Sequence, residues 1–285
     1  MAIVLEGKFH DLGGLTVTRV LPNAQKRMVG PFIFFDHMGP SQFQPGQGID
    51  VRPHPHIGLC TITYLFEGAQ VHRDSLGNHA DVLPGDVNFM TAGRGIVHSE
   101  RENIETRSSS HSLNGLQCWV ALPKHHAEVE PSFTHVAKND LPCYMLEGVM
   151  MRLLAGEAYG MSSPLKTYSP LLYIDAIAQA DAVIELPTAK YDLELAIYVI
   201  EGDLTIADTT YKQGSFVLLD DLNEVVRANS FVRFVMVGGE AFSEIPHIEW
   251  NFVSFSKERI EQAKDDWRNG KFASIPSDAR EHIPY

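Results

Sequence analysis

Residues 63–68, TYLFEG, return in a closely similar form at residues 197–202 as IYVIEG, with Tyr, Glu and Gly in register. Each copy is followed by a turn glycine that opens another apolar run, LPGDVNFM at 83–90 and KQGSFVLL at 212–219. Two motifs repeated in the same order indicate a duplicated structural unit. The chain is therefore predicted to contain two similar β-barrels.

Short apolar runs extend this pattern outward along the chain. Examples are LTVTRVL, LQCWVALP and FVRFVMVGG, in a sequence with 22 glycines and 16 prolines. Runs rich in β-branched and aromatic residues that end at turn residues are typical of strands in a sandwich or barrel. We therefore predict an all-β protein with two tandem barrels, residues 1–140 and 141–285. The linker-like composition of KNDLP places the junction near residues 139–142.

One α-helix is predicted near the C-terminus. Ser256 can cap its first turn, and Ile260, Ala263 and Trp267 fall at positions i, i+3 and i+7. Gly270 supplies a stop signal. We expect the three apolar residues to pack onto a barrel wall.

The composition excludes several classes of protein. The 285-residue chain has a formal net charge of −13, whereas nucleic-acid binding needs a basic surface. No run approaches the roughly 18 apolar residues of a membrane-spanning helix, and Met1–Gly14 lacks the pattern of a signal peptide. The three cysteines form neither a disulfide framework nor CxxC pairs. We expect a soluble, cytoplasmic protein with no direct nucleic-acid or membrane partner.

The segment RPHPHIG contains the first pair of candidate metal ligands, His54 and His56. Residues i and i+2 of an extended chain point to the same face. Pro53 and Pro55 favour the extended geometry, because the residue before a proline is pushed out of the helical region. Two imidazoles should therefore project side by side, although a single HxH pair in a strand is commonly structural.

A second pair with the same spacing is His98 and Glu100, in RGIVHSE. Three neutral imidazoles and one carboxylate suit Fe, Mn, Co, Ni, Cu or Zn and leave positions open for water, substrate or dioxygen. The interior of a barrel is where side chains from separate strands can converge. We therefore predict one transition-metal ion bound by His54, His56, His98 and Glu100.

The internal repeat favours a metal site over a structural role for these residues. Counting from the repeated motifs, none of the four candidate ligands has a His or Glu at its equivalent position in the second half. Those positions are Thr188, Lys190, Arg227 and Asn229. One site is predicted, not two, with Lys190 and Arg227 repelling any cation in the second barrel.

Other polar residues are weaker candidates. Asp36 and His37 follow an apolar run and could line the mouth of the barrel, or Asp36 could cap a turn that ends the strand. Gln117 could face the site or point outward. Cys60 and Cys118 lie in apolar runs, where packing is the expected role.

The blocks GIDVRPHPHIGLCTITYLFEG, LPGDVNFMTAGRGIVHSER and LNGLQCWVALP resemble the pirin family of the cupin superfamily, and WNFVSFSKERIEQAKDDWRNGKF resembles the tail of its bacterial members. The resemblance covers nearly the whole chain. It implies a bicupin fold with iron, Fe(II), in the N-terminal barrel, held by His54, His56, His98 and Glu100. Residues 57–60 lack the glutamate that most cupins place after HxH, and Glu100 replaces it, as in pirins.

The resemblance implies two functions of different classes. The first is a quercetin 2,3-dioxygenase-like oxidoreductase that uses O2 to open a flavonol ring and releases carbon monoxide. In such a quercetinase Glu100 could accept the proton of a bound hydroxyl. The second is a metal- or redox-responsive regulator that binds a transcription factor or a metabolic enzyme. We favour the enzyme, while a metal that is bound but idle is a third alternative.

Overall fold

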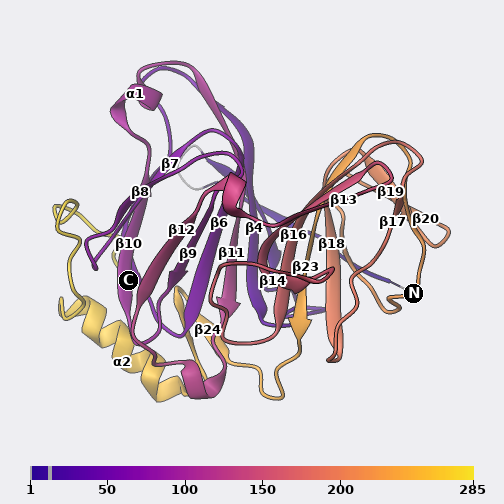
Figure 1. The fold of residues 1–285 in the computed structure, drawn as a ribbon. Coiled ribbons are helices and arrows are strands. Elements are labelled where there is room, and N and C mark those ends of the chain that lie inside the picture. The colour runs from indigo at the N-terminus through magenta and orange to yellow at the C-terminus, as the bar shows by residue number, and fades with distance from the viewer. Residues whose placement is uncertain (1, 12–14) are drawn as a thin grey trace. The chain divides into compact units, whose positions relative to one another are not determined.

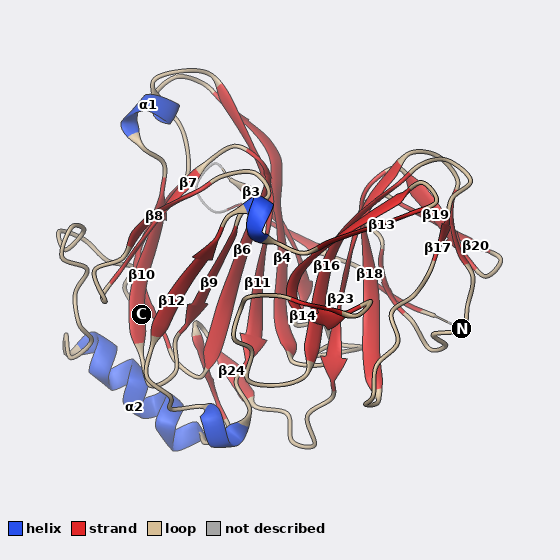
Figure 2. Ribbon diagram, viewed as in Figure 1, coloured by secondary structure: helices blue, strands red, loops and turns tan. Residues whose placement is uncertain are grey.

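The computed structural model describes residues 2–11 and 15–285, which are mostly β-strands (Figures 1 and 2). Met1 and residues 12–14 of the N-terminal stretch lie outside the described residues. The chain forms two compact units. The N-terminal barrel unit consists of Phe9–Arg19, Phe34–Lys138 and Ser243–Tyr285, and the C-terminal barrel unit consists of the segment ending at Lys8, Val20–Ile33 and Asn139–Phe242. Each unit thus draws on segments from both sides of residue 140.

The N-terminal barrel unit is built on a seven-stranded sheet in the order β12-β9-β6-β11-β4-β3-β2 and a four-stranded sheet in the order β5-β10-β7-β8. The strands of the larger sheet are β2 (Lys8–Asp11), β3 (Thr16–Leu21), β4 (Phe32–Phe43), β6 (Leu59–Glu67), β9 (Val87–Thr91), β11 (His111–Ala121) and β12 (Ser132–Val136). Those of the smaller sheet are β5 (Asp50–His56), β7 (Gln70–Asp74), β8 (His79–Val82) and β10 (Ile96–Arg101).

The C-terminal barrel unit has the same organisation. An eight-stranded sheet runs β1-β21-β18-β23-β16-β14-β13, with β15 beside β14, and a four-stranded sheet runs β17-β22-β19-β20. The strands are β1 (Ile3–Leu5), β13 (Cys143–Leu146), β14 (Val149–Ala158), β15 (Met161–Ser162), β16 (Leu171–Ala178), β17 (Val183–Ile184), β18 (Leu193–Glu201), β19 (Asp203–Ile206), β20 (Thr209–Lys212), β21 (Phe216–Leu218), β22 (Val226–Ala228) and β23 (Val232–Glu240).

The repeated sequence motif forms the same structure twice. Residues 63–68 end β6, and residues 197–202 end β18, with Tyr64 and Tyr198 fully buried. Gly68 and Gly202 both have a positive φ, +90° and +76°. A Cβ at either position would lie within 2.4 Å of a backbone oxygen, so only glycine fits. The predicted all-β fold with duplicated barrels is confirmed.

The remaining elements are short, apart from the C-terminal helix. They are α1 (Ile104–Arg107), α2 (Lys257–Arg268), the 3₁₀ turns Lys124–His126 and Lys138–Asp140, and the hairpin of β24 (His247–Glu249) and β25 (Phe252–Ser254). No helix among the described residues is long and apolar enough to cross a membrane.

The helix α2 has the predicted cap and the predicted buried face. The Ser256 side chain accepts a hydrogen bond from the backbone N–H of Arg259 at 3.2 Å. Ile260 and Ala263 are buried in an apolar cluster, with Trp267 half-buried at its edge. The other core members of this cluster, Ile57 and Phe252, belong to the N-terminal barrel unit, so the helix packs against the barrel that carries both histidine pairs.

Ile260→Ala is expected to lower the free energy of unfolding by about 2–5 kcal/mol, because it removes a buried side chain and leaves a cavity. Thermal unfolding followed by circular dichroism measures the effect. Lys257→Ala, at an exposed position of the same helix, is the matched control and should change little. An Ile260→Ala protein as stable as the control would contradict the packing described for α2.

Candidate metal centre

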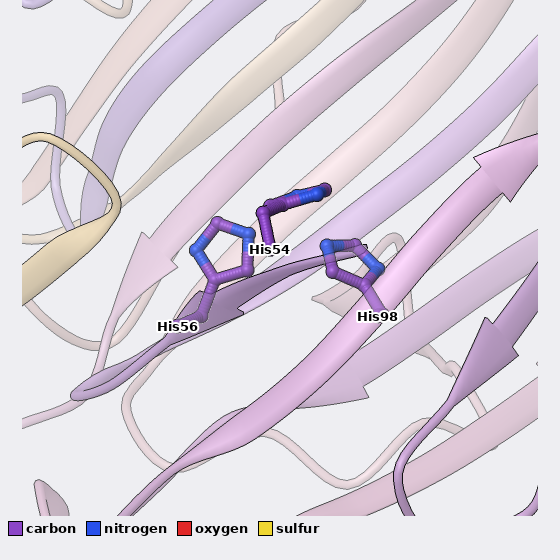
Figure 3. A group of neighbouring side chains, drawn as sticks. All are labelled: His54, His56 and His98. Atoms are coloured by element: carbon purple, nitrogen blue, oxygen red, sulfur yellow. The ribbon is translucent and has the colours of Figure 1, made fainter. Parts of the chain in front are cut away.

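The two histidine-bearing segments form neighbouring strands of the four-stranded sheet. Strand β10 pairs antiparallel with β5 and places His98 directly opposite His54, while His56 lies two residues further along β5. The three imidazoles point toward one another (Figure 3), and one donor nitrogen from each lies within 4.8 Å of the others. His54, His56 and His98 are only 6%, 1% and 1% exposed. The structure therefore brings together the three histidines proposed from the sequence.

Two of the imidazoles are oriented by backbone carbonyls. The Nδ1 of His54 lies 2.9 Å from the carbonyl oxygen of Arg52, and the Nδ1 of His56 lies 3.0 Å from that of Asn251. A carbonyl can only accept, so each Nδ1 carries the proton and donates it. The Nε2 of each ring is then left with a free lone pair, which is the arrangement that metal-binding histidines use.

Glu100 lies at the edge of the histidine cluster. Its Oε1 is 3.6 Å from Nδ1 of His98, and its Oε2 is 3.9 Å from Nε2 of His54. Both ring nitrogens of His98 and Oε2 of Glu100 are buried and have no hydrogen-bond partner in the described part of the chain. Buried polar atoms are rarely left unsatisfied without a reason. A metal ion ligated by one nitrogen of His98 and by Glu100 would satisfy two of these three atoms, so the donor set fits such an ion.

Burial keeps the cluster uncharged in the absence of metal. Desolvation lowers the pKa of His54 to about 4 and lowers the pKa values of His56 and His98 well below their usual value. The same desolvation raises the pKa of Glu100 to about 8, so its carboxyl group holds a proton at neutral pH. The interior thus presents three neutral imidazoles and one neutral acid.

Aromatic rings of the seven-stranded sheet face this cluster from the opposite wall. The Trp119 ring meets His56 edge-on, with centroids 5.0 Å apart, and stacks on Phe34 at 4.0 Å. Neither ring was predicted from the sequence to be part of the site. Both lie within continuous apolar runs of β4 and β11, which do not distinguish them from ordinary core residues.

A second imidazole–carboxylate pair lies beside His98. The His72 Nε2 is 3.1 Å from Oδ2 of Asp74, and its ring is 5.4 Å from that of His98. Phe133 stacks on the His72 ring, with centroids 4.2 Å apart. Both His72 and Asp74 are buried, and Asn78 fixes the carboxylate with its amide group. This pair was not predicted from the sequence, although HRD in a strand has the same i, i+2 spacing as the two ligand pairs.

The C-terminal segment that contains Asp278 and Ile283 forms hydrogen bonds with both ligand-bearing strands. Asp278 accepts hydrogen bonds from Ser99 at 2.8 Å and from Nε of Arg101 at 2.7 Å, two residues of β10 that alternate with the candidate ligands. On β5, the carbonyl oxygen of Pro53 accepts from the N–H of Ile283 at 2.8 Å. These contacts fix both strands in place next to the site.

The structure places Asp36 and His37 inside β4, which continues to Phe43. The alternative of a turn that ends the strand is therefore wrong, because the polar pair interrupts the apolar pattern without breaking the hydrogen-bonded ladder. Asp36 forms a two-pronged ion pair with Arg19, with its oxygens 2.7 and 2.9 Å from the guanidinium nitrogens. His37 lies 2.8 Å from the side-chain oxygen of Asn114.

Gln117 accepts a hydrogen bond from the hydroxyl of Thr63 at 2.7 Å and lies on the same face of β11 as Trp119. It therefore points inward. Cys60 and Cys118 are fully buried, and burial raises the pKa of the Cys60 thiol to about 12, which fits the expected packing role.

The C-terminal barrel differs from the prediction in detail. Thr188 and Lys190 are exposed between β17 and β18, and Arg227 and Asn229 are exposed on or beside β22. Counting residues from the repeated motif does not find the positions equivalent to His54 and His56, because eight residues separate β17 from β18 whereas two separate β5 from β6. A slip of one residue also moves a side chain to the opposite face of a strand. The interior is instead lined by apolar residues: Ile184, Leu204, Ile206, Val226 and Ala228.

A duplicated barrel with converging histidines in one copy is the arrangement of a bicupin with a single candidate metal centre. Within the described residues, only His54, His56 and His98 form such a group. Comparison with protein families specifies the class further. The Pirin model matches residues 14–120, and the Pirin C-terminal cupin domain model matches residues 173–273. The chain belongs to the pirin family of the cupin superfamily.

Individual relatives extend over nearly the whole chain. A pirin-like protein of Caulobacter vibrioides is 45% identical over 99% of this chain and 98% of its own length. A Pseudomonas aeruginosa protein named provisionally as a quercetin 2,3-dioxygenase is 38% identical, over 90% of this chain and 80% of its own. The crystal structure of a quercetin 2,3-dioxygenase from Acinetobacter baumannii superposes with a TM-score of 0.90 and 32% identity, covering 100% of this chain and 94% of that one.

Proposed function

We propose that this protein is a metal-dependent oxygenase of the quercetin 2,3-dioxygenase type, which opens a flavonol-like ring with O2. The observation that carries the proposal is the convergence of three buried, neutral imidazoles beside an unpartnered carboxyl group. One transition-metal ion, for which we favour Fe(II), would be held by His54, His56, His98 and Glu100. When bound, the metal would supply Lewis-acid and redox chemistry.

The protein's own residues would perform the proton transfer and exclude water. In the metal-free protein burial raises the pKa of Glu100 to about 8, so metal binding would displace its proton, and the resulting carboxylate could accept the proton of a bound hydroxyl. The Trp119 and Phe133 rings, on the facing wall, would cover the planar face of the substrate next to the imidazoles. The names of two relatives support the flavonol assignment.

The activity is tested by loading the protein with ferrous iron and following quercetin consumption and carbon monoxide release under air. We expect turnover above that of an equal concentration of free iron, and none under nitrogen. If fully loaded protein consumes no more quercetin than free iron does, the oxygenase proposal fails. A metal-responsive regulatory role would then have to be tested by its own binding assay.

Metal affinity is expected to rise with pH up to about pH 8, by at most tenfold per pH unit, because binding must displace the Glu100 proton. The loss near pH 6.5 expected from an ordinary imidazole does not apply, since burial holds the pKa of His54 near 4. Chelator competition between about pH 6 and about pH 8.5 measures the slope. Glu100→Gln should remove it, and equal slopes in the two proteins would argue against Glu100 as a ligand.

A further inference from the structure

The wall that faces the histidine cluster carries two parallel rows of side chains with different chemistry. Strand register places the residues of each row side by side across β11, β6, β9 and β12. The ring row, next to the cluster, is Trp119, Thr61, Met90 and Phe133, and Phe34 extends it by stacking on Trp119. The polar row lies two residues away from the ring row on each strand and consists of Gln117, Thr63, Asn88 and His135. On β4, Asp36 stands two residues from Phe34 and extends this row.

Two ring contacts place the ring row beside the cluster: Trp119 meets His56 of the cluster, and Phe133 stacks on His72, which neighbours His98. The chain order shows on which side the polar row lies. Strands β5 and β6 meet at a two-residue corner, so His56 and Thr61 lie close to the corner on their strands. Further from the corner, the next residue whose side chain points into the barrel is His54 on β5 and Thr63 on β6. The polar row therefore lies toward His54, on the side of the cluster where Glu100 is found.

Two hydrogen bonds join members of the polar row, and one buried donor of the row has no partner among the described residues. The Thr63 hydroxyl donates to Gln117 at 2.7 Å, and the Oδ1 of Asn88 lies 2.7 Å from Nδ1 of His135. Asn88 is only 3% exposed, and its Nδ2 has no partner among the described residues. A buried donor without an acceptor costs free energy. Because Asn88 shares a face with Met90 of the ring row, this donor points into the barrel interior.

The duplicated barrel supplies an internal comparison. Thr63 precedes Tyr64 as Ile197 precedes Tyr198, and Asn88 and Val217 each lie three residues after the turn glycine. Gln117 pairs with Thr63 across β11 and β6, and Met236 pairs with Ile197 across β23 and β18, so Gln117 and Met236 occupy equivalent positions. Ile197, Val217 and Met236 all lie in the apolar core of the C-terminal barrel unit. The fold therefore does not require a polar row, which occurs in the barrel that has the histidine cluster.

We propose that the polar row is a hydrogen-bonding subsite for a planar aromatic ligand, with Asn88 donating to an oxygen substituent other than those bound at the histidine cluster. The inference rests on the proposed function, since it assumes that a 3-hydroxy-4-keto edge of the ligand supplies the oxygens bound at the cluster. The ring row covers part of the ligand's planar face. His135, whose side chain is 33% exposed, marks the end of the row that is open to solvent.

Asn88→Leu tests the subsite, because it keeps the approximate shape and removes the amide. Two probes share a 3-hydroxy-4-keto edge. Quercetin carries further hydroxyl groups, whereas 3-hydroxyflavone carries none. Binding is measured by the absorbance change of the flavonol on metal-loaded protein under nitrogen, so that no turnover is needed. We expect about tenfold weaker binding of quercetin and less than about twofold change for 3-hydroxyflavone.

Asn229→Leu, at an exposed asparagine of the C-terminal barrel unit, is the matched control and should bind both probes as the wild type does. If Asn88→Leu does not fold or load metal, Thr63→Val tests the same row and should show the same selective loss. Equal weakening for both probes, unchanged quercetin binding, or no quercetin binding by the loaded wild type would each overturn the subsite. Quercetin that binds with this selectivity but is not consumed under air would overturn the oxygenase proposal alone.

Discussion

Glu100→Gln is expected to slow flavonol consumption by about 100-fold or more at equal metal content, the usual effect of losing a positioned general base. Glutamine keeps the shape of the side chain but cannot accept the proton of a bound hydroxyl. In the metal-free protein desolvation raises the pKa of this buried acid to about 8, so the carboxylate that acts as the base would form when metal binding displaces its proton. The variant should still bind metal through three imidazoles, although more weakly. Rates must therefore be compared per bound metal ion.

The control for this experiment is Glu67→Gln, a glutamate exposed at the end of β6. It should leave the rate per metal ion unchanged. If Glu100→Gln turns over flavonol as fast as the wild type at equal occupancy, the proton-acceptor role is wrong and only the ligand assignment survives. If both variants lose activity equally, the loss does not come from the site.

His54→Ala combined with His98→Ala is expected to abolish stoichiometric metal binding, from about one ion per chain to almost none. The two residues lie directly opposite each other on β5 and β10 and supply two of the three converging imidazoles. Loss of a hydrogen-bond partner of a ligand typically costs 10–100-fold in affinity, so loss of two ligands should cost more. Elemental analysis of protein purified without a tag measures the change.

His79→Ala combined with His125→Ala removes two exposed histidines and is the matched control for that experiment. It should retain the metal. Two ions per chain in the wild type would contradict a single centre, and one ion retained after the His54 and His98 substitutions would show that the metal lies elsewhere.

The strand pattern, the duplication and the C-terminal helix follow from local sequence. Alternation and turn residues depend on near neighbours, so TYLFEG and IYVIEG predict the same strand end in both barrels. The i, i+2 spacing likewise places His54 and His56 on one face, because it depends only on the geometry of an extended chain. These features need no knowledge of distant contacts.

Equivalent positions in the second barrel could not be found by counting, because loop lengths differ between the copies. The segment between β17 and β18 is longer than that between β5 and β6, so Thr188 and Lys190 fall outside the barrel interior. Only the paired strands show that apolar side chains such as Ile184 and Val226 line that interior.

The environment of the site was also decided by tertiary structure. The pairing of β5 with β10 brings His98 opposite His54 from 44 positions away in the chain, and β7 adds the His72–Asp74 pair. Asn251 and Asp278 reach the site from the C-terminal segment. The residue types and their spacing are local properties and can be read from the chain. Burial, pKa shifts and hydrogen-bond partners arise from contacts between segments far apart in sequence, so they exist only in the folded protein.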